Sequence, residues 1–295
     1  MNKRINEYLD RLKDELKGSD QALVQDALAD ARDHLTVAFE NALREKSGRE
    51  EQDVWQQLIE KFGSPAETAS AYREAEARLG APLASVRPAR PKSFLAAFLS
   101  VFTEARAWGA FIYCLLSFLT GLIYCSWAIV GGSFSLLSLL FIIGIPVAGL
   151  FFLSLKGIAL VEGRIVEALL AVRMPRRPLF VSRELTWLKK FKALVFATRT
   201  WKTFFYLVTQ FPLGFLYLII IGGLFVLSLS FIASPVLELV FHLPLDLMGD
   251  NVFTPIWLLP LVFLAGLILL PLTLHLAKWI GRLHGRYAKA MLVGD

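Results

Sequence analysis

Few residues in this 295-residue sequence have the type and spacing that catalysis or metal binding requires. It contains no GxxxxGK phosphate-binding loop, no HExxH or GxSxG motif, and no cysteine pair spaced for zinc. The histidines are far apart along the chain, and Cys114 and Cys125 lie eleven residues apart in one apolar segment, too distant on a helix to form a disulfide. We therefore expect no enzymatic activity, no metal and no cofactor.

One group of polar residues recurs at intervals of four in the otherwise apolar stretch 231–254, namely Glu238, His242, Asp246 and Asp250. If this stretch is helical, the first three share a face and could bind a cation, a basic peptide or a proton. The alternative, which we favour, is that they keep the outer side of an interfacial helix hydrated. This loop is still the best candidate for an extracytoplasmic input site.

Small or polar residues recur at helical spacing within two apolar segments. They are Ser117, Gly121 and Cys125 in the first segment and Gln210, Gly214 and Gly222 in the second. Small residues let membrane helices approach closely. We predict that Gly121 and Gly214 mark a helix crossing, and we prefer this interpretation to a ligand channel. Gln210 and His275 are expected to form hydrogen bonds between helices.

The positions of these residues follow an internal repeat of two apolar hairpins. Arg106 and Trp108 of the first copy match Arg199 and Trp201 of the second at an offset of 93 residues. The hairpin ends match at an offset of 122, as Lys156 does with Lys278 and Gly163 with Gly285. The pattern predicts a duplicated two-helix membrane unit, with repeat 1 at about 94–173 and repeat 2 at about 187–293.

Composition agrees with a membrane protein, since the mean hydropathy is +0.55 and 56% of residues are hydrophobic. Four apolar segments, at roughly 109–130, 134–155, 203–230 and 255–277, are long enough to cross a bilayer. Lys and Arg are absent from 107–155 and from 203–277 but frequent in 156–202. The positive-inside rule therefore predicts cytoplasmic termini and two hairpins that run parallel.

After each hairpin, an amphipathic segment is expected to lie along the inner membrane surface. Glu162, Arg164 and Glu167 could pair there with the basic loop or with the head, but we expect them to be solvated. The basic residues near this surface are candidates for contact with anionic lipid headgroups: Arg164, Arg173, Arg176, Arg177, Lys189, Lys190, Lys192 and Arg286.

Residues 1–80 differ in character and predict a small cytoplasmic bundle of four helices. Ser64-Pro65 followed by Glu67 predicts a capping box at the start of the fourth helix. This head holds 12 Lys or Arg against 17 Asp or Glu, while the rest of the chain holds 19 against 8. An acidic head argues against direct binding of nucleic acid. Residues 81–92, rich in proline, predict a semi-rigid linker to the membrane domain at 93–295.

The residues of the head that carry a resemblance are the INEYL helix and the sequence WQQLIEKFGSPAETASAY, with Gly63, Ser64, Pro65, Ala69 and Tyr72. They resemble the HAAS signalling domain of bacterial membrane proteins, a family associated with PadR-type transcription regulators. The resemblance implies a role in protein contact.

In the membrane half, the stretch GRIVEALL (163–170), the ending VRMPRRP and the sequence RTWKTFFYL are similar to the sensor domain attached to many bacterial histidine kinases. The resemblance covers about 94–293 and implies reception of a signal at a membrane. No kinase part follows Asp295, so any output would pass through the head or a partner.

Together these features predict an all-α protein of the bacterial inner membrane that acts as a non-enzymatic sensor or signal transducer. Its partners would be the bilayer, a PadR-like regulator or another cytoplasmic protein, and a second copy of the chain in a homo-oligomer. Two other functions stay open: transport of a lipid or small hydrophobic molecule, alone or as an accessory subunit, and a scaffold that tethers a membrane complex. A continuous cavity would favour transport, whereas a tightly packed Gly121–Gly214 crossing would favour the sensor.

Overall fold

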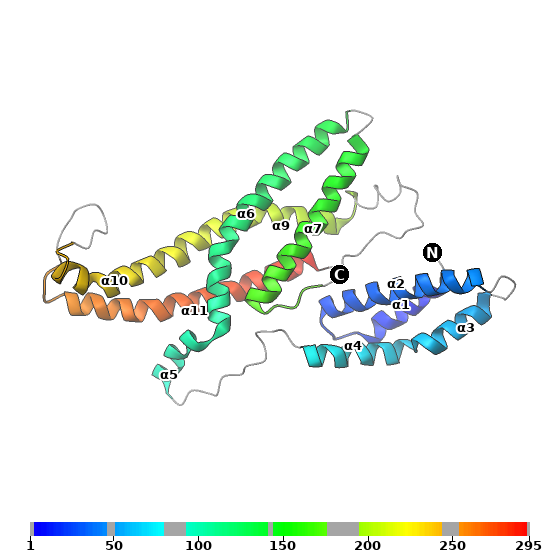
Figure 1. The fold of residues 1–295 in the computed structure, drawn as a ribbon, viewed down its shortest axis with the longest axis horizontal. Helices are drawn as coiled ribbons and strands as arrows, with labels where there is room; N and C mark the ends of the chain where they lie inside the picture. Colours follow the sequence, from blue (N-terminus) through cyan, green and yellow to red (C-terminus); the bar gives the residue numbers. More distant parts are fainter. Residues whose placement is uncertain are drawn as a thin grey trace.

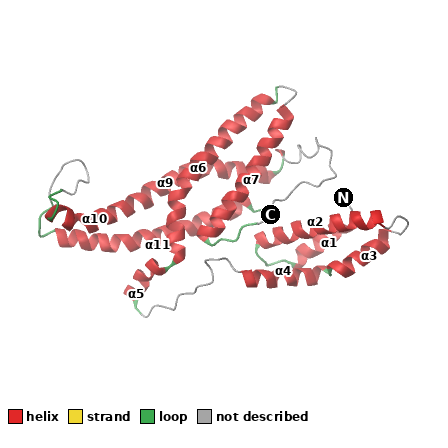
Figure 2. Cartoon of the chain, viewed as in Figure 1, coloured by secondary structure: helices red, strands yellow, loops and turns green. Residues whose placement is uncertain are grey.

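The computed structural model describes residues 3–45, 51–79, 93–140, 144–175, 195–243 and 254–293, and within these ranges every regular element is a helix (Figure 2). The head consists of four helices, and these match the four expected from the sequence. They are α1 (Lys3–Glu15), α2 (Gln21–Glu45), α3 (Glu51–Phe62) and α4 (Pro65–Leu79). The linker predicted at 81–92 lies outside the described residues.

The head is held together by the apolar stripe of α1, which supplies Ile5, Leu9 and Leu12 to a core shared with α2 and α4. The joint between α3 and α4 is fixed by polar contacts. Ser64 N–H donates to Glu67 Oε2 at 2.8 Å and Glu67 N–H donates to Ser64 Oγ at 3.3 Å, which confirms the capping box. The Ser64 N–H and hydroxyl both donate to the Glu67 carboxylate, and these two bonds lower the pKa of Glu67. Tyr8, whose pKa is raised mainly by burial, donates to the Gly63 carbonyl at 3.0 Å.

The membrane half begins with a short helix, α5 (Phe94–Leu99), and the turn η1 (Ser100–Thr103). Four long helical stretches follow, and each is long and apolar enough to cross a membrane. They are α6 (Ala105–Ser138), α7 (Gly144–Leu170), the continuous run of α9 (Thr198–Tyr217), π-helical η2 (Leu218–Gly222) and α10 (Gly223–Leu239), and α11 (Leu259–Leu292).

The expected break between the first two segments, near Gly131 and Gly132, is wrong, because α6 continues to Ser138. Instead of forming a turn, these glycines leave space for a side chain of the neighbouring helix α7. A Cβ at Gly131 would lie 2.8 Å from the Phe151 ring, so the ring on α7 packs directly against the α6 backbone.

The expected separation of inner amphipathic helices from the spanning helices is also wrong. Both α7 and α11 continue through these segments without interruption. The C-terminal ends of both helices are buried against other helices through residues such as Val166 and Leu170 on α7 and Ala288 on α11. An exposed apolar face remains on α7, where Val161 is 57% exposed.

The two hairpins, α6–α7 and α9–α10 with α11, cross each other near the middle of α6 and open away from the crossing (Figure 1). The ends of α7 and α11 lie on the side of the crossing that faces the head. His275 on α11 stacks on Phe98 and hydrogen-bonds its carbonyl at 3.1 Å, which fixes α5 to the bundle.

Candidate functional site

The hairpins cross where glycines bring the backbones of α6 and α9 together. A Cβ at Gly121 would lie 2.6 Å from the carbonyl oxygen of Gln210, and a Cβ at Gly214 would lie 2.3 Å from that of Ser117. Both distances are too short for any side chain, and the blocking atoms are backbone. The two helices therefore contact each other without side chains between them at this point.

A cluster of polar side chains lies buried beside this crossing, centred on Glu162 of α7. Three groups donate to Glu162 Oε1: the hydroxyl of Tyr113 at 2.7 Å, the hydroxyl of Tyr206 at 3.1 Å and the amide of Gln210 at 3.3 Å. Glu162 and Gln210 are both 0% exposed. Because a buried carboxylate is costly without donors, these bonds are what allows Glu162 to lie in the core.

His284 of α11, 1% exposed, completes the cluster on the other side. Its Nε2 lies 2.7 Å from the Tyr113 hydroxyl and 3.1 Å from that of Tyr206, and its Nδ1 lies 3.1 Å from the Tyr217 hydroxyl. If both phenols donate to Glu162, Nε2–H must donate to the phenol oxygens and Tyr217 then donates to Nδ1. The cluster, defined here as Tyr113, Glu162, Tyr206, Gln210, Tyr217 and His284, thus forms one continuous chain of hydrogen bonds.

The contacts in this region come in pairs that the sequence offsets relate. Tyr113 and Tyr206 differ by 93 positions, and so do Gly121 and Gly214. Glu162 and His284 differ by 122, the offset of the hairpin ends. Each hairpin therefore contributes a tyrosine from its first helix and one titratable group from its second. Tyr124, the counterpart of Tyr217, also interacts with Glu162 electrostatically, although Glu162 Oε2 has no hydrogen bond within 3.5 Å.

The expectation that Glu162 and Glu167 are solvated is wrong, since both are buried. The sequence interpretation also treated the histidines as scattered and so missed His284 next to Glu162. The signal was present in the alignment of the repeats, because the offset of 122 pairs Glu162 with His284. Because the two residues are of different types, a match of identical residues does not reveal the pair.

A short strap, residues 171–175, turns back from the end of α7 across α11. Ala171 has a φ of 55°, in the left-handed region, and this reverses the chain. Val172 then packs on Gly285 and the fully buried Met174 packs on Gly163. The strap holds Arg173 between these two anchors, and Arg173 contacts the head.

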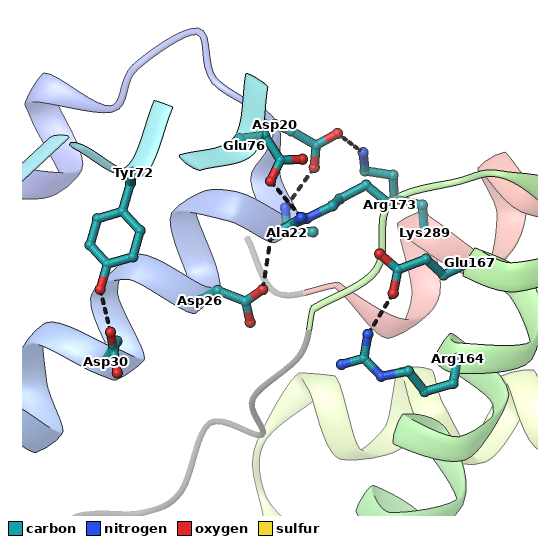
Figure 3. A network of polar contacts seen from close by, with 10 residues as sticks. All are labelled: Asp20, Ala22, Asp26, Asp30, Tyr72, Glu76, Arg164, Glu167, Arg173 and Lys289. Carbon is teal, nitrogen blue, oxygen red and sulfur yellow. Dashed lines mark hydrogen bonds and ion pairs between the residues drawn. The ribbon is translucent and has the colours of Figure 1, made fainter. Parts of the chain in front are cut away.

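Among the described residues, the head meets the membrane half through ion pairs of Arg173 and Lys289 of the membrane half with carboxylates of the head (Figure 3). Arg173 contacts Asp26 Oδ2 of α2 at 3.3 Å and Glu76 Oε2 of α4 at 2.5 Å, and the Arg173 side chain is only 13% exposed. Lys289 of α11 pairs with Asp20, whose Oδ1 also accepts from the Ala22 amide at the start of α2. The net negative head and the net positive body are thus joined by complementary charges.

Among the candidate headgroup contacts, Arg173 therefore lies against head carboxylates. Arg164 pairs with Glu167 at 2.5 Å, and Arg286 is exposed on α11. The other five, Arg176, Arg177, Lys189, Lys190 and Lys192, lie outside the described residues.

The candidate input loop does not continue α10 as one helix from Glu238 to His242. Helix α10 ends at Leu239, so no continuous helical face joins Glu238 to His242, and His242 is exposed with a φ of 53°. Glu238 is buried and accepts from the amide and hydroxyl of Thr254 at 2.9 and 2.7 Å, which ties the end of α10 to the segment that leads into α11. Asp246 and Asp250 lie outside the described residues.

The remaining candidate residues of the helix crossing are Ser117, Cys125 and Gly222. The Ser117 hydroxyl donates to the Cys114 carbonyl on its own helix, Cys125 is half-buried with a free thiol, and Gly222 ends the π-helical turn η2. Within the described ranges, no group of three or more His, Cys, Asp or Glu side chains is placed to hold a metal ion.

Comparison with known families agrees with this architecture. Residues 7–71 match the family HAAS, and residues 113–292 match the family Sensor, which carries the description "Putative sensor". Neither a curated protein nor a solved structure matches the chain. Four helices able to cross a membrane, a HAAS domain and a sensor module together fit a multi-pass membrane sensor. The Sensor match covers more than half of the chain, and the chain therefore belongs to the Sensor family.

Proposed function

We propose that this protein receives a stimulus in or at the membrane and transmits it by releasing its head to bind a cytoplasmic partner. The observation that carries the proposal is that the same two helices serve both sites. Helix α7 holds Glu162 of the cluster and leads directly into Arg173, which contacts the head. Helix α11 holds His284 of the cluster and, five residues later, Lys289, which also contacts the head. A shift of α7 against α11 would therefore alter both head contacts.

The polar cluster suits the role of a two-state element. Its hydrogen bonds are directional and join all parts of the crossing, so the hairpins cannot slide without exchanging partners. Coupling between distant sites requires an element with two discrete arrangements that both sites bias. The transmitted change would be the choice of partners within the cluster, and the response would be the strength of head docking.

The proposed location is the bacterial inner membrane with both termini and the head in the cytoplasm. The distribution of Lys and Arg supports this orientation. The end of α7 with the strap that bears Arg173, and the end of α11 that bears Lys289, would then face the cytoplasm together with the head. The 231–254 region would lie on the opposite side and remains the candidate for an external input.

The partner is proposed to be a soluble protein that binds the acidic head surface when Arg173 and Lys289 no longer cover it. The HAAS match supports a protein-contact role, and a PadR-like regulator is the expected class. Transport is less favoured because backbone contacts close the crossing between Gly121 and Gly214. A passive scaffold would keep its partner regardless of head docking, and this distinguishes it from the sensor.

The test is cross-linking in membranes followed by capture of the tagged protein. The intact chain, a version without residues 1–80, and the variants Arg173→Glu and Arg164→Glu would be compared. We expect a soluble regulator to be captured only by chains with a head, and more strongly by Arg173→Glu. Arg164→Glu is the matched control, since Arg164 pairs only with Glu167 of its own helix among the contacts described. Capture that is equal with and without the head would contradict the proposal.

A further inference from the structure

A cavity lies where α7, the start of α9 and the end of α11 meet. Its volume is about 60 Å³, and part of it is open to the surroundings. Most of its wall is apolar, with Leu155 and Leu160 of α7 among the lining residues. Two lining side chains are cationic, Lys156 and Arg199, and Thr203 adds a hydroxyl. A mainly apolar cavity with two cations is suited to an amphiphilic anion.

Arg199 is held at one end only. Its Nη2 donates to the Leu292 carbonyl at 2.9 Å, which fixes the guanidinium at the end of α11. Its Nη1 is buried and has no hydrogen-bond partner. Lys156 lies near enough for the two positive charges to repel each other. A buried, charged donor without an acceptor is unfavourable, so an acceptor from outside the chain is expected here.

At the corresponding position of the other hairpin, the acceptor is a carboxylate of the chain itself. Lys278, the counterpart of Lys156 at an offset of 122, forms an ion pair with Glu104, which occupies the N-cap position of α6 but makes no side-chain capping hydrogen bond. The counterpart of Glu104 at an offset of 93 is Ala197, which caps the start of α9 without any side-chain hydrogen bond. The carboxylate present at one helix start is therefore missing at the other, where the partial positive charge of α9 is added to Arg199.

From these contacts we propose that the cavity binds a phosphate group, carried by an anionic lipid headgroup or present as free phosphate. Arg199 Nη1 and Lys156 would bind the phosphate oxygens, with Thr203 and the first turn of α9 beside them. The apolar wall would cover the glycerol and upper acyl part when the source is a lipid. This inference rests on the cavity and on the buried Arg199 Nη1, which has no hydrogen-bond partner, and it is independent of the proposed sensor function.

The experiment uses the full-length protein in nanodiscs of phosphatidylcholine containing a small fraction of phosphatidylglycerol, with retained lipid measured by native mass spectrometry. We expect wild-type protein to enrich phosphatidylglycerol at least tenfold over its share of the bilayer. Ala197→Glu supplies the missing carboxylate from within the chain and should abolish the enrichment while thermal stability is kept. Arg199→Gln should also abolish it. Arg106→Gln, at the exposed counterpart of Arg199, is the control and should retain it.

A second arm distinguishes the two sources of phosphate. Millimolar inorganic phosphate is added to protein in phosphatidylcholine alone, and thermal stabilisation is measured for wild type and Ala197→Glu. Enrichment of the lipid without stabilisation by phosphate assigns the site to a headgroup, and the reverse assigns it to free phosphate. The proposal is overturned if Ala197→Glu behaves as wild type in both arms, or if wild type responds in neither.

Discussion

The hairpin α6–α7 and the hairpin built from α9, α10 and α11 make the same kinds of contact at the crossing. They differ at two positions where only the first hairpin has a carboxylate. Each contributes a glycine and a tyrosine from its first helix. On the second helix, however, one has Glu162 where the other has His284, and at the start of the first helix one has Glu104 where the other has Ala197. The shared residues build the crossing. The differing residues make its two sides chemically unequal, and we assign function to them.

The largest effect is expected where the hairpins are alike. Gly214→Ala places a Cβ 2.3 Å from the Ser117 carbonyl oxygen, and only movement of the α6 backbone could relieve the clash. We expect a cost of about 3 kcal/mol, the upper end of the usual range for overpacking, because backbone must move. Thermal unfolding in nanodiscs should show a large loss of stability. Gly223→Ala, where a Cβ would meet nothing within 4 Å, is the control and should be neutral. Equal stability of the two variants would mean that the crossing is not closely packed.

The next effect concerns the difference between Glu162 and His284. Glu162→Leu leaves two phenols and the Gln210 amide without their shared acceptor, whereas His284→Leu removes a group bonded only to phenols. The first change should cost about 2–3 kcal/mol and the second about 1–2 kcal/mol, because unsatisfied buried donors dominate such losses. Unfolding of both variants in the same nanodiscs measures this order. A larger loss for His284→Leu would reverse our assignment of the centre of the cluster.

A smaller effect should be confined to the head. Arg173→Glu turns attraction to Asp26 and Glu76 into repulsion, so the head should leave the membrane half while both parts stay folded. Hydrogen exchange in the first turns of α2 and the last turns of α4 should rise severalfold. Arg164→Glu should leave this exchange unchanged. Protection that persists in Arg173→Glu would show that other contacts hold the head.

The smallest effect is expected within the head, at the contact between Ser64 and Glu67. The pKa of Glu67 is lowered because Ser64 donates to its carboxylate, so this contact stabilises the start of α4 above the ordinary carboxyl pKa. That contribution is lost as the pH falls through the lowered pKa. Amide protection factors at the start of α4 should fall on acidification in wild type and change less in Glu67→Gln. The same acid dependence in both would exclude Glu67 as the cause.

Much of the fold was predictable because its causes are local or periodic. The four head helices, the Ser64–Glu67 capping box and four membrane helices follow from apolar spacing, caps and segment length. The loop positions were harder, since Gly131 and Gly132 have the composition of a turn but serve the packing of Phe151. Only the position of a neighbouring helix decides between these two uses of glycine.

The candidate site was less predictable because its residues come from four helices. Glu162 has charged neighbours in sequence, Arg164 and Glu167, so it has the local pattern of a solvated surface. Its burial depends on Tyr113 and Tyr206, which lie 49 and 44 residues away. The docking of Arg173 on Asp26 likewise joins residues 147 apart. The basic charge of the membrane half was assigned to lipid headgroups, so the contact of Arg173 with the head was not predicted.

The central claim is that the polar cluster controls head docking, and a distance measurement tests it most directly. Spin labels at positions 40 and 282, both exposed, would be introduced into full-length protein whose Cys114 and Cys125 have been replaced. Pulsed electron resonance in nanodiscs then compares wild type, Glu162→Gln and Arg173→Glu. We predict one short distance in wild type, and a longer population shared by Glu162→Gln and Arg173→Glu. A wild-type distance in a folded Glu162→Gln protein, with a longer one in Arg173→Glu, would contradict the account.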